Sequence, residues 1–256
     1  MTTTVTRYEV RQGAAWIVLD SPGNRNALSA PLVAELGAHM HTAFADPAAR
    51  AIVLTGAGPA FCAGADLKNR GDAVAAGGAG ENPFVAILRA MWDGPKPVIV
   101  AANGHAFGGG VGLVAAADIA IAVDSATLSF SEVRVGVIPA MISVVALPKL
   151  GVHHAMRLFL TGARFSAEEA RGYGLVHRVV PATELAAAVQ AEVDAIALGG
   201  PNAVREAKRL VRTVSRVSMD EGFAYAEAKI AELFASPEAA EGMMAFATKR
   251  PPSWAS

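Results

Sequence analysis

Short apolar segments that run into glycine-rich loops recur along this chain of 256 residues. Residues 51–55 lead into a loop that begins at Gly56, and residues 97–102 lead into a second loop that ends in Gly-Gly-Gly-Val-Gly at 108–112. Glycine loses more backbone freedom on folding than any other residue, so such a run costs free energy. Four glycines among five residues therefore indicate a place where the backbone itself must approach another group closely.

The spacing of these segments predicts an α/β fold. The apolar segments lie too far apart for simple hairpins, which favours strands joined by crossover connections. Two strands around a Gln-Gly turn are expected near the N-terminus, and two more follow the glycine run. The expected strands comprise residues 8–11, 15–19, 51–55, 97–102, 118–123 and 126–130.

Helical patterns dominate the rest of the chain. Ser29 stands where a helix cap is expected, and Ser166 to Glu169 form a capping-box sequence. Beyond Pro201 the pattern is helical, with two apolar stripes that contain Val204, Ala207, Leu210, Val211 and Val214, and Phe223, Ile230 and Phe234. We therefore expect residues 1–195 to form a core with the functional site. Residues 196–256 are expected to form a helical oligomerisation region that packs on the core or on another subunit.

The composition argues against several classes of protein. A formal net charge of -1 gives no electrostatic reason to expect nucleic acid or an anionic membrane as partner. The longest apolar run, 111–123, is interrupted by Asp118 and is shorter than the roughly 20 residues that a membrane-spanning helix needs. A single cysteine, Cys62, and an N-terminus without a secretory pattern predict a cytoplasmic protein without internal disulfides.

Several familiar motifs are absent from the sequence. A dinucleotide fingerprint at 56–61 would need glycine where Phe61 stands, and neither Gly-Lys-Ser/Thr nor Gly-x-Ser-x-Gly occurs. The six histidines include no spacing such as HExxH, so no metal is expected. Two glycine loops remain, 61–66 and 106–112, whose backbone N–H groups can stabilise developing negative charge. Two such groups directed at one oxygen would form an oxyanion hole.

Together these loops match a known family. The sequence Phe-Cys-Ala-Gly-Ala-Asp-Leu at 61–67, the glycine triplet and Ser-Glu-Val-Arg-Val-Gly-Val-Ile-Pro at 131–139 resemble the crotonase superfamily of enoyl-CoA hydratases and isomerases. Similar segments at 160–170, 174–176 and 241–250 extend the resemblance over nearly the whole chain. The resemblance implies a crotonase-like spiral of repeated ββα units with a C-terminal helical region.

The resemblance also implies roles for individual residues. The thioester carbonyl of an acyl-CoA would sit between the backbone amides of Ala65 and Gly109, which stabilise an enolate, and Glu132 would be the acid/base. An apolar pocket would raise the pKa of Glu132 and suit it to proton transfer, whereas an ion pair with Arg134 is the alternative interpretation. Cys62, beside the expected hole, is interpreted as a small buried residue.

One position departs from the family pattern. Well-studied hydratases of the family carry a second glutamate where this chain has Gly112. A double-bond shift needs only one base, whereas two carboxylates ease hydration, so Gly112 favours a 3,2-enoyl-CoA isomerase. The sequence Pro-Ala-Met-Ile-Ser at 139–143 instead resembles branched-chain hydratases, in which it replaces the usual Pro-Gly-Ala-Gly-Gly. We therefore expect a hydratase first, an isomerase as the alternative, and a non-catalytic acyl-CoA-binding subunit as the third reading.

Substrate binding and assembly are implied in the same way. The residues that match CoA-binding positions are Arg25, Ala27, Ala63, Asp66, Leu67, Phe246 and Lys249. The last two match positions that some relatives contribute across a subunit boundary, and the family implies a homotrimer or a dimer of trimers. Coenzyme A is part of the substrate, so no separate cofactor is expected. Arg25 is equally interpreted as a solvated loop cation, Asp66 as a helix cap, and the glycine-rich segment 71–82 as a loop beside the acyl pocket.

Overall fold

The computed structural model describes residues 4–67 and 81–255, and within these ranges the strands form two sheets. The larger sheet has, in spatial order, β1 (Thr6–Arg11), β2 (Ala14–Leu19), β3 (Ala51–Gly56), β5 (Val98–Ala102), β7 (Ile119–Val123) and β10 (Arg178–Val180). The smaller sheet has β4 (Ala60–Cys62), β6 (His105–Phe107), β8 (Thr127–Ser129) and β9 (Arg164–Ser166). Every strand expected from the sequence is present, with ends shifted by one or two residues.

Successive strands alternate between the two sheets. β3, β5 and β7 are parallel neighbours in the larger sheet, and β4, β6 and β8 are parallel neighbours in the smaller one. The chain runs β5, β6, α4 and then β7, β8, α5, so each strand–strand–helix unit adds one strand to each sheet. These units are the ββα repeats of the expected spiral, and they confirm the predicted α/β class.

The helices begin close to their predicted caps. They are α1 (Ala30–Ala45), α3 (Pro83–Asp93), α4 (Gly109–Ala116), α5 (Ala140–Thr161), α6 (Ala167–Gly172), α7 (Leu185–Ala197), α8 (Pro201–Val214), α9 (Met219–Phe234) and α10 (Pro237–Ala247). Single 3-10 turns span Pro22–Asn24, Glu132–Val135 and Ala182–Glu184. The predicted capping box is formed: the Ser166 hydroxyl accepts from the Glu169 N–H, and the Glu169 carboxylate accepts from the Ser166 N–H. Ser29 precedes α1 as predicted, but its side chain makes no capping hydrogen bond.

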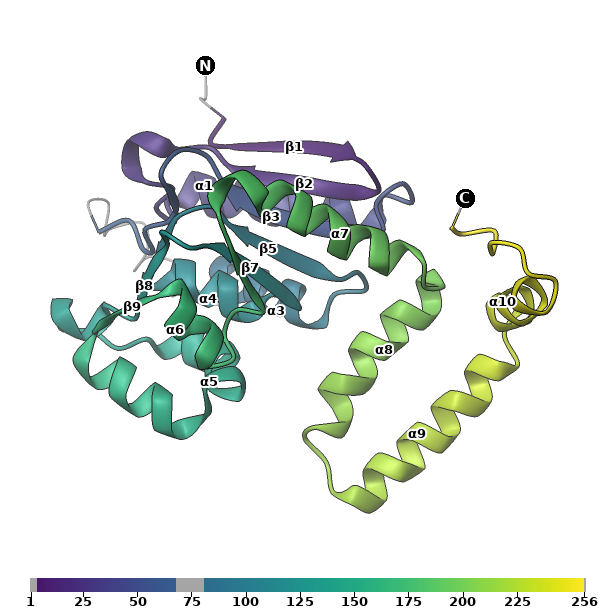
Figure 1. Cartoon of the computed structure of the whole chain (residues 1–256). Helices are drawn as coiled ribbons and strands as arrows, with labels where there is room; N and C mark the ends of the chain where they lie inside the picture. Colours follow the sequence, from purple (N-terminus) through teal and green to yellow (C-terminus); the bar gives the residue numbers. More distant parts are fainter. Residues whose placement is uncertain (1–3, 68–80, 256) are drawn as a thin grey trace.

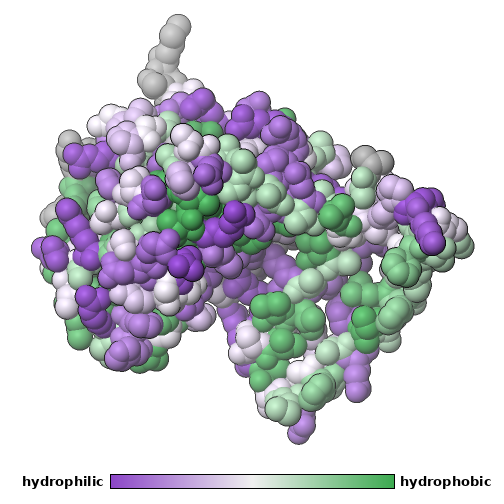
Figure 2. All heavy atoms as spheres, viewed as in Figure 1, coloured by the Kyte–Doolittle hydropathy of each residue, from purple (hydrophilic) through white to green (hydrophobic). Residues whose placement is uncertain are grey.

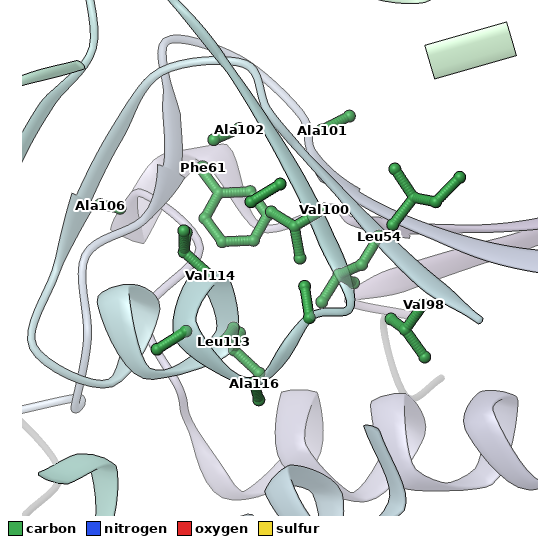
Figure 3. Close-up of a cluster of buried hydrophobic side chains, with 14 of the residues drawn as sticks. Leu54, Phe61, Val98, Val100, Ala101, Ala102, Ala106, Leu113, Val114 and Ala116 are labelled. Carbon is green, nitrogen blue, oxygen red and sulfur yellow. The ribbon is translucent and has the colours of Figure 1, made fainter. Parts of the chain in front are cut away.

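The core lies between the sheet strands and the helices that cover them. In Figure 1, α7 crosses in front of the larger sheet and α1 lies behind it. Helix α4 carries no polar side chain and is buried from Gly110 to Ala116, packed against α3, α5 and strands of both sheets. Figure 3 shows its Leu113 and Val114 close to Phe61 of β4 and Val100 of β5, all of them fully buried. This packing holds the N-terminus of α4 in a fixed position relative to β4 and β6.

Helices α8, α9 and α10 form an arm that extends away from the two sheets (Figure 1). The predicted apolar stripes of this arm do not pack on the core of the same chain, since Val211, Phe223 and Phe234 are 64%, 64% and 62% exposed. Figure 2 shows hydrophobic residues gathered over α8 and α9. Among the described residues, no helix combines the length and the apolar character needed to cross a bilayer.

Candidate active site

The three predicted catalytic residues come together at one edge of the smaller sheet. Because β4, β6 and β8 run parallel as neighbours, their carboxyl ends lie at the same edge. Ala65, Gly109 and Glu132 each follow the end of one of these strands within three residues. The carboxyl ends of parallel strands are where open α/β sheets bind ligands. Parallel pairing therefore gathers three residues that are far apart along the chain.

The loops that follow β4 and β6 touch each other through glycine. Gly64 has φ 85°, a left-handed conformation that favours glycine. A Cβ atom at Gly64 would lie 2.6 Å from the Phe107 carbonyl oxygen and 3.3 Å from the Gly109 nitrogen. A residue with a side chain could not fit there without moving the backbone. Glycine at this position thus allows the loops carrying Ala65 and Gly109 to meet.

Both backbone amides are available as hydrogen-bond donors. Gly109 is the first residue of α4, where an N–H group has no acceptor within the helix. Leu28 pairs with Ala65 in an isolated parallel bridge, and its N–H donates to the Gly64 carbonyl at 2.8 Å. In the described part of the chain, neither the Ala65 N–H nor the Gly109 N–H donates to another backbone group. The helix dipole of α4 adds positive potential at Gly109.

Ala65 and Gly109 line the same cavity, which has a volume of about 870 Å³. Its walls are mainly apolar and include Leu28, Pro31, Val33, Phe84, Val137, Ile138, Met141 and Ile142. Asp66 and Glu132 are the charged side chains among its described lining residues. A largely apolar cavity with a few directed polar groups is typical of sites for small ligands.

Glu132 places its carboxylate over the glycine turn. Its Oε1 lies 3.1 Å from the point where a Cβ of Gly108 would stand, directly before the Gly109 amide. Its Oε2 is buried and has no hydrogen-bond partner among the described residues. Burial raises the pKa of Glu132 above its usual value, because water no longer stabilises the charged form. A carboxyl group in this state is suited to exchange a proton with a ligand in the cavity.

The alternative interpretation of Glu132 as one half of a surface ion pair is wrong. Arg134 points elsewhere, and its Nε donates to the Thr161 carbonyl oxygen at 3.4 Å. The 3-10 turn that begins at Glu132 ends at Gly136, whose φ of 79° closes the turn. The turn directs Glu132 into the cavity, where, within the part of the chain that the structure describes, its side chain is hydrogen-bonded only by its own backbone.

The sequence predicts that position 112 differs from other family members, and the structure shows an apolar side chain in the space beside it. Gly112 is buried in α4, one turn after Gly109. The space beside it belongs to Ile142 of α5, which is 3% exposed and lines the cavity. Sequence reasoning noted Ile142 only as part of the 139–143 motif, because nothing local to it reveals that it faces Gly112.

Cys62 is a structural residue, as the sequence predicts. It is fully buried, and burial raises the pKa of its thiol to about 12. A Cβ on Gly110 would lie 2.3 Å from the Cys62 carbonyl oxygen, so this strand end packs directly under α4. A thiol with so high a pKa is protonated near neutral pH and is a poor nucleophile.

Five of the predicted CoA-binding residues lie around the same strand end. The Ala63 N–H donates to the Arg25 carbonyl at 3.0 Å, which holds the 25–28 loop against the loop after β4. Asp66 lines the cavity, Leu67 is exposed next to it, and Ala27 is buried. The Arg25 side chain is exposed and is not among the described residues that line the cavity.

Two predictions concern residues that the structure does not describe. A helix capped by Asp66 would fall on residues 68–80, and most of the segment 71–82 falls there too. The end of that segment is described: Asn82 lines the cavity and caps α3, its side chain accepting from the Phe84 N–H at 2.9 Å.

Phe246 and Lys249 do not join the site within one chain. They lie at the end of α10 and just after it, and Figure 1 places α10 at the opposite side of the molecule from β8. Phe246 is 88% exposed. A CoA role for either residue would therefore require the cavity of another copy of the chain.

Sequence reasoning missed Asn26, which fixes the geometry of the site. Asn26 is fully buried and has φ 55°. Its Nδ2 donates to the carbonyls of Ala57, Ala60 and Phe61 at 3.0, 2.9 and 3.2 Å. Asparagine tolerates the left-handed conformation better than most residues, and its side-chain amide can donate these hydrogen bonds. An asparagine in the turn after Pro22 was the available signal, but its partners lie more than thirty residues away.

Comparisons with known proteins agree with this fold. The family model described as enoyl-CoA hydratase/isomerase matches residues 9–256. A carnitinyl-CoA dehydratase from Proteus mirabilis is 38% identical over 248 residues, which cover 93% of each chain. The crystal structure of an enoyl-CoA hydratase/isomerase from Marinobacter aquaeolei has a TM-score of 0.90 at 35% identity and covers 98% of this chain and 99% of that one. An enoyl-CoA hydratase from Bacillus anthracis has a TM-score of 0.88 at 33% identity, covering 97% and 98%.

The fold and the site define an α/β protein in which two backbone N–H groups and the carboxylates of Glu132 and Asp66 lie at a mainly apolar cavity. The extent of the family match places the chain within a single family of enzymes that process acyl-CoA thioesters. The chain belongs to the enoyl-CoA hydratase/isomerase family, which confirms the resemblance drawn from its sequence.

Proposed function

We propose that this enzyme adds water across the 2,3 double bond of an acyl-CoA thioester, with Glu132 as its acid/base. The observation that carries the proposal is the position of the Glu132 carboxylate. Its Oε2 is buried and has no partner among the described residues, and its Oε1 lies over the turn that presents the Gly109 amide. A buried polar atom without a partner costs free energy, so its presence at a cavity favours a functional reason.

The main chain would stabilise the negative charge that develops on the thioester oxygen. The thioester oxygen would accept hydrogen bonds from the N–H groups of Ala65 and Gly109, which have no other backbone partner in the described part of the chain. As electrons move from the double bond onto this oxygen, an enolate forms and both hydrogen bonds strengthen. Loss of one such donor typically costs about 3 to 4 kcal/mol of transition-state stabilisation.

The proton steps fall to Glu132. In the ionised form it accepts a proton from water while the water oxygen bonds to C3, and the electron pair of the double bond moves to the thioester oxygen. The carboxyl group then returns the proton to C2 as the enolate collapses. A raised pKa brings the carboxyl closer to neutral pH, where it serves in both roles.

A 3,2-enoyl-CoA isomerase is the second candidate, and one observation favours it. Among the described lining residues near Gly112 the cavity wall is formed by Ile142 and Phe84, so Glu132 has no second carboxylate beside it there. A single base that removes a proton at C2 and returns it at C4 completes a double-bond shift without water. The apolar character of this wall supports that chemistry.

CoA binding and assembly belong to the same proposal. Ala27, Ala63, Asp66 and Leu67 lie around the strand end that carries Ala65, which is where the thioester would approach. The exposed Phe246 and Lys249 would reach the cavity of another copy in a homotrimer or a dimer of trimers. The exposed apolar stripes of α8 and α9 give such an assembly a surface to bury.

The test uses purified full-length protein with 2-enoyl- and 3-enoyl-CoA thioesters of equal chain length. We expect 3-hydroxyacyl-CoA from the 2-enoyl substrate, and a rate that declines as pH falls through the raised pKa of Glu132. Glu132→Gln should lower kcat by at least ~100-fold while CoA still binds, because the amide cannot accept the proton. Glu184→Gln, at the exposed start of α7, is the matched control and should keep full activity.

Each outcome of this experiment is informative. Double-bond migration without hydration would select the isomerase. Binding of both thioesters without turnover would select the non-catalytic subunit. Full activity in the Glu132→Gln variant would contradict the role assigned to this residue.

A further inference from the structure

Gly112 and Ile142 share one volume beside the reacting centre. Gly112 lies three residues after Gly109 in α4, so the two positions project from the same side of the helix. Ile142 lies in the first turn of α5, is buried, and forms part of the cavity wall. The α4–α5 contact therefore brings a side chain from a distant part of the chain to the place where residue 112 has none.

The two positions cannot both carry side chains. A Cβ atom on Gly112 would lie 2.3 Å from the Ile142 Cγ2 and 2.9 Å from the Ile142 Cβ. The second distance cannot be relieved by rotating the side chain, because Cβ is fixed by the backbone of α5. A β-branched side chain in a helix also has one strongly preferred rotamer, so Cγ2 has little freedom. Any residue other than glycine at 112 would have to push the two helices apart.

The cavity wall beside Gly112 has no free space, and it is also apolar. The next nearest atom to a Cβ on Gly112 is Phe84 Cζ at 3.8 Å. A water molecule held against this wall would find carbon atoms instead of hydrogen-bond partners, which is unfavourable. The reacting carbons of a bound acyl group would therefore face Glu132 on one side and hydrocarbon on the other.

We infer that Ile142 is the specificity-determining residue that keeps a second acid/base out of position 112, and that it thereby sets the balance between hydration and double-bond migration. The inference rests on the proposed function for its chemical consequence. With position 112 blocked, no carboxylate at that position can share the proton transfer with Glu132. Removal of the Ile142 side chain is then the condition for placing a second carboxylate at 112.

Four proteins test the structural half of this inference: the wild type, Gly112→Glu, Ile142→Gly and the double variant. We expect Gly112→Glu to lower Tm by roughly 5 °C or more, or to prevent folding, because the added side chain overlaps Ile142. The double variant should unfold within a few degrees of Ile142→Gly, since the space has been cleared. Gly112→Glu combined with Val144→Gly, an exposed position of the same helix, is the matched control and should stay as unstable as Gly112→Glu. A Gly112→Glu protein as stable as the wild type would overturn the inference.

The chemical half is read from the ratio of hydration to isomerisation, measured as kcat/KM on 2-enoyl- and 3-enoyl-CoA. We expect the double variant to raise this ratio by roughly tenfold or more over Ile142→Gly, because a second positioned acid/base is typically worth at least that much. A purely structural role of Ile142 would leave the ratio unchanged, and an unchanged ratio would refute the specificity role. If the wild type converts neither thioester, the proposed function fails, whereas the Tm comparison and any gain of hydration in the double variant still decide the inference.

Discussion

Glu132 carries a free-energy cost that its position in the cavity explains. The residue is half-buried, its Oε2 is buried without a partner among the described residues, and this burial raises its pKa. The folded chain therefore holds this proton more tightly than the unfolded chain does. Such a group lowers the free energy of unfolding wherever it is ionised in both states.

The Glu132→Gln variant should be more thermally stable than the wild type near neutral pH. The ordinary pKa of the group is 4.5 and the folded value is higher, so both states are protonated well below 4.5 and the cost vanishes there. The cost grows between 4.5 and the folded pKa and is complete above it. In calorimetry from about pH 4 to about pH 8, the Tm of the variant minus the Tm of the wild type should increase as pH rises. No gain at the alkaline end would mean that the carboxylate is better solvated than the structure indicates.

Helix α8 is joined to the core by its charged face. Asp118, between α4 and β7, accepts from Lys208 Nζ at 2.7 Å and from Arg212 Nη2 at 3.0 Å. Its Oδ2 also accepts from the Val98 N–H at 2.8 Å, and Arg212 stacks over Trp92 with its Cζ 3.4 Å from the ring centre. The amphipathic helix thus turns its basic face inward and leaves its apolar face outside.

Asp118→Ala should destabilise the protein by about 3 to 5 kcal/mol, because removing one partner leaves buried cations uncompensated. Lys208 and Arg212 are only 8% and 18% exposed, and the pKa of the nearby Lys149 is already lowered to about 8, first by burial and then by Arg212. Urea unfolding of the variant would measure the loss. Asp20→Ala is the control: its ion pair with Arg7 is exposed, so we expect a loss below about 1 kcal/mol. Equal losses in the two variants would exclude a special role for the Asp118 cluster.

At the scale of the whole molecule, the arm formed by α8–α10 exposes large apolar side chains. Met219, Phe223, Ile230 and Phe234 of α9 are all more than half exposed, and they lie in the region where Figure 2 shows hydrophobic residues gathered. Soluble monomers rarely expose large contiguous apolar patches. The arm is therefore suited to pack on another copy of the chain.

Replacing Phe223 and Phe234 by aspartate should convert the proposed oligomer into a monomer, because charge on this face opposes its burial. Light scattering coupled to size-exclusion chromatography would report the mass. Glu227→Gln, an exposed residue of the same helix, should leave the mass unchanged. An unchanged mass in the double aspartate variant would place the subunit contact elsewhere. Retention of monomer mass by the wild type would remove the basis for CoA contacts from Phe246 and Lys249.

Features governed by neighbouring residues were readable from the sequence. The Ser166–Glu169 capping box forms as predicted, because both of its hydrogen bonds join residues three apart. The strands around the glycine loops were found for a similar reason, since apolar runs bounded by glycine mark buried strands locally. The motif resemblance then added Ala65, Gly109 and Glu132, and their gathering at one sheet edge follows from the parallel order of β4, β6 and β8.

Contacts between distant segments could not be read in this way. Arg134 follows Glu132 closely in sequence, yet it bonds to Thr161 at the end of α5. Ile142 fills the space beside Gly112 because α4 and α5 pack together, and Asn26 holds carbonyls of the loop after β4. Periodicity and capping depend on a few successive residues, so the chain specifies them wherever it folds. Which side chain occupies a given volume depends on how helices and loops from remote parts of the chain come together. Only that packing fills the space beside Gly112 with Ile142 and places the Glu132 carboxylate at the glycine turn.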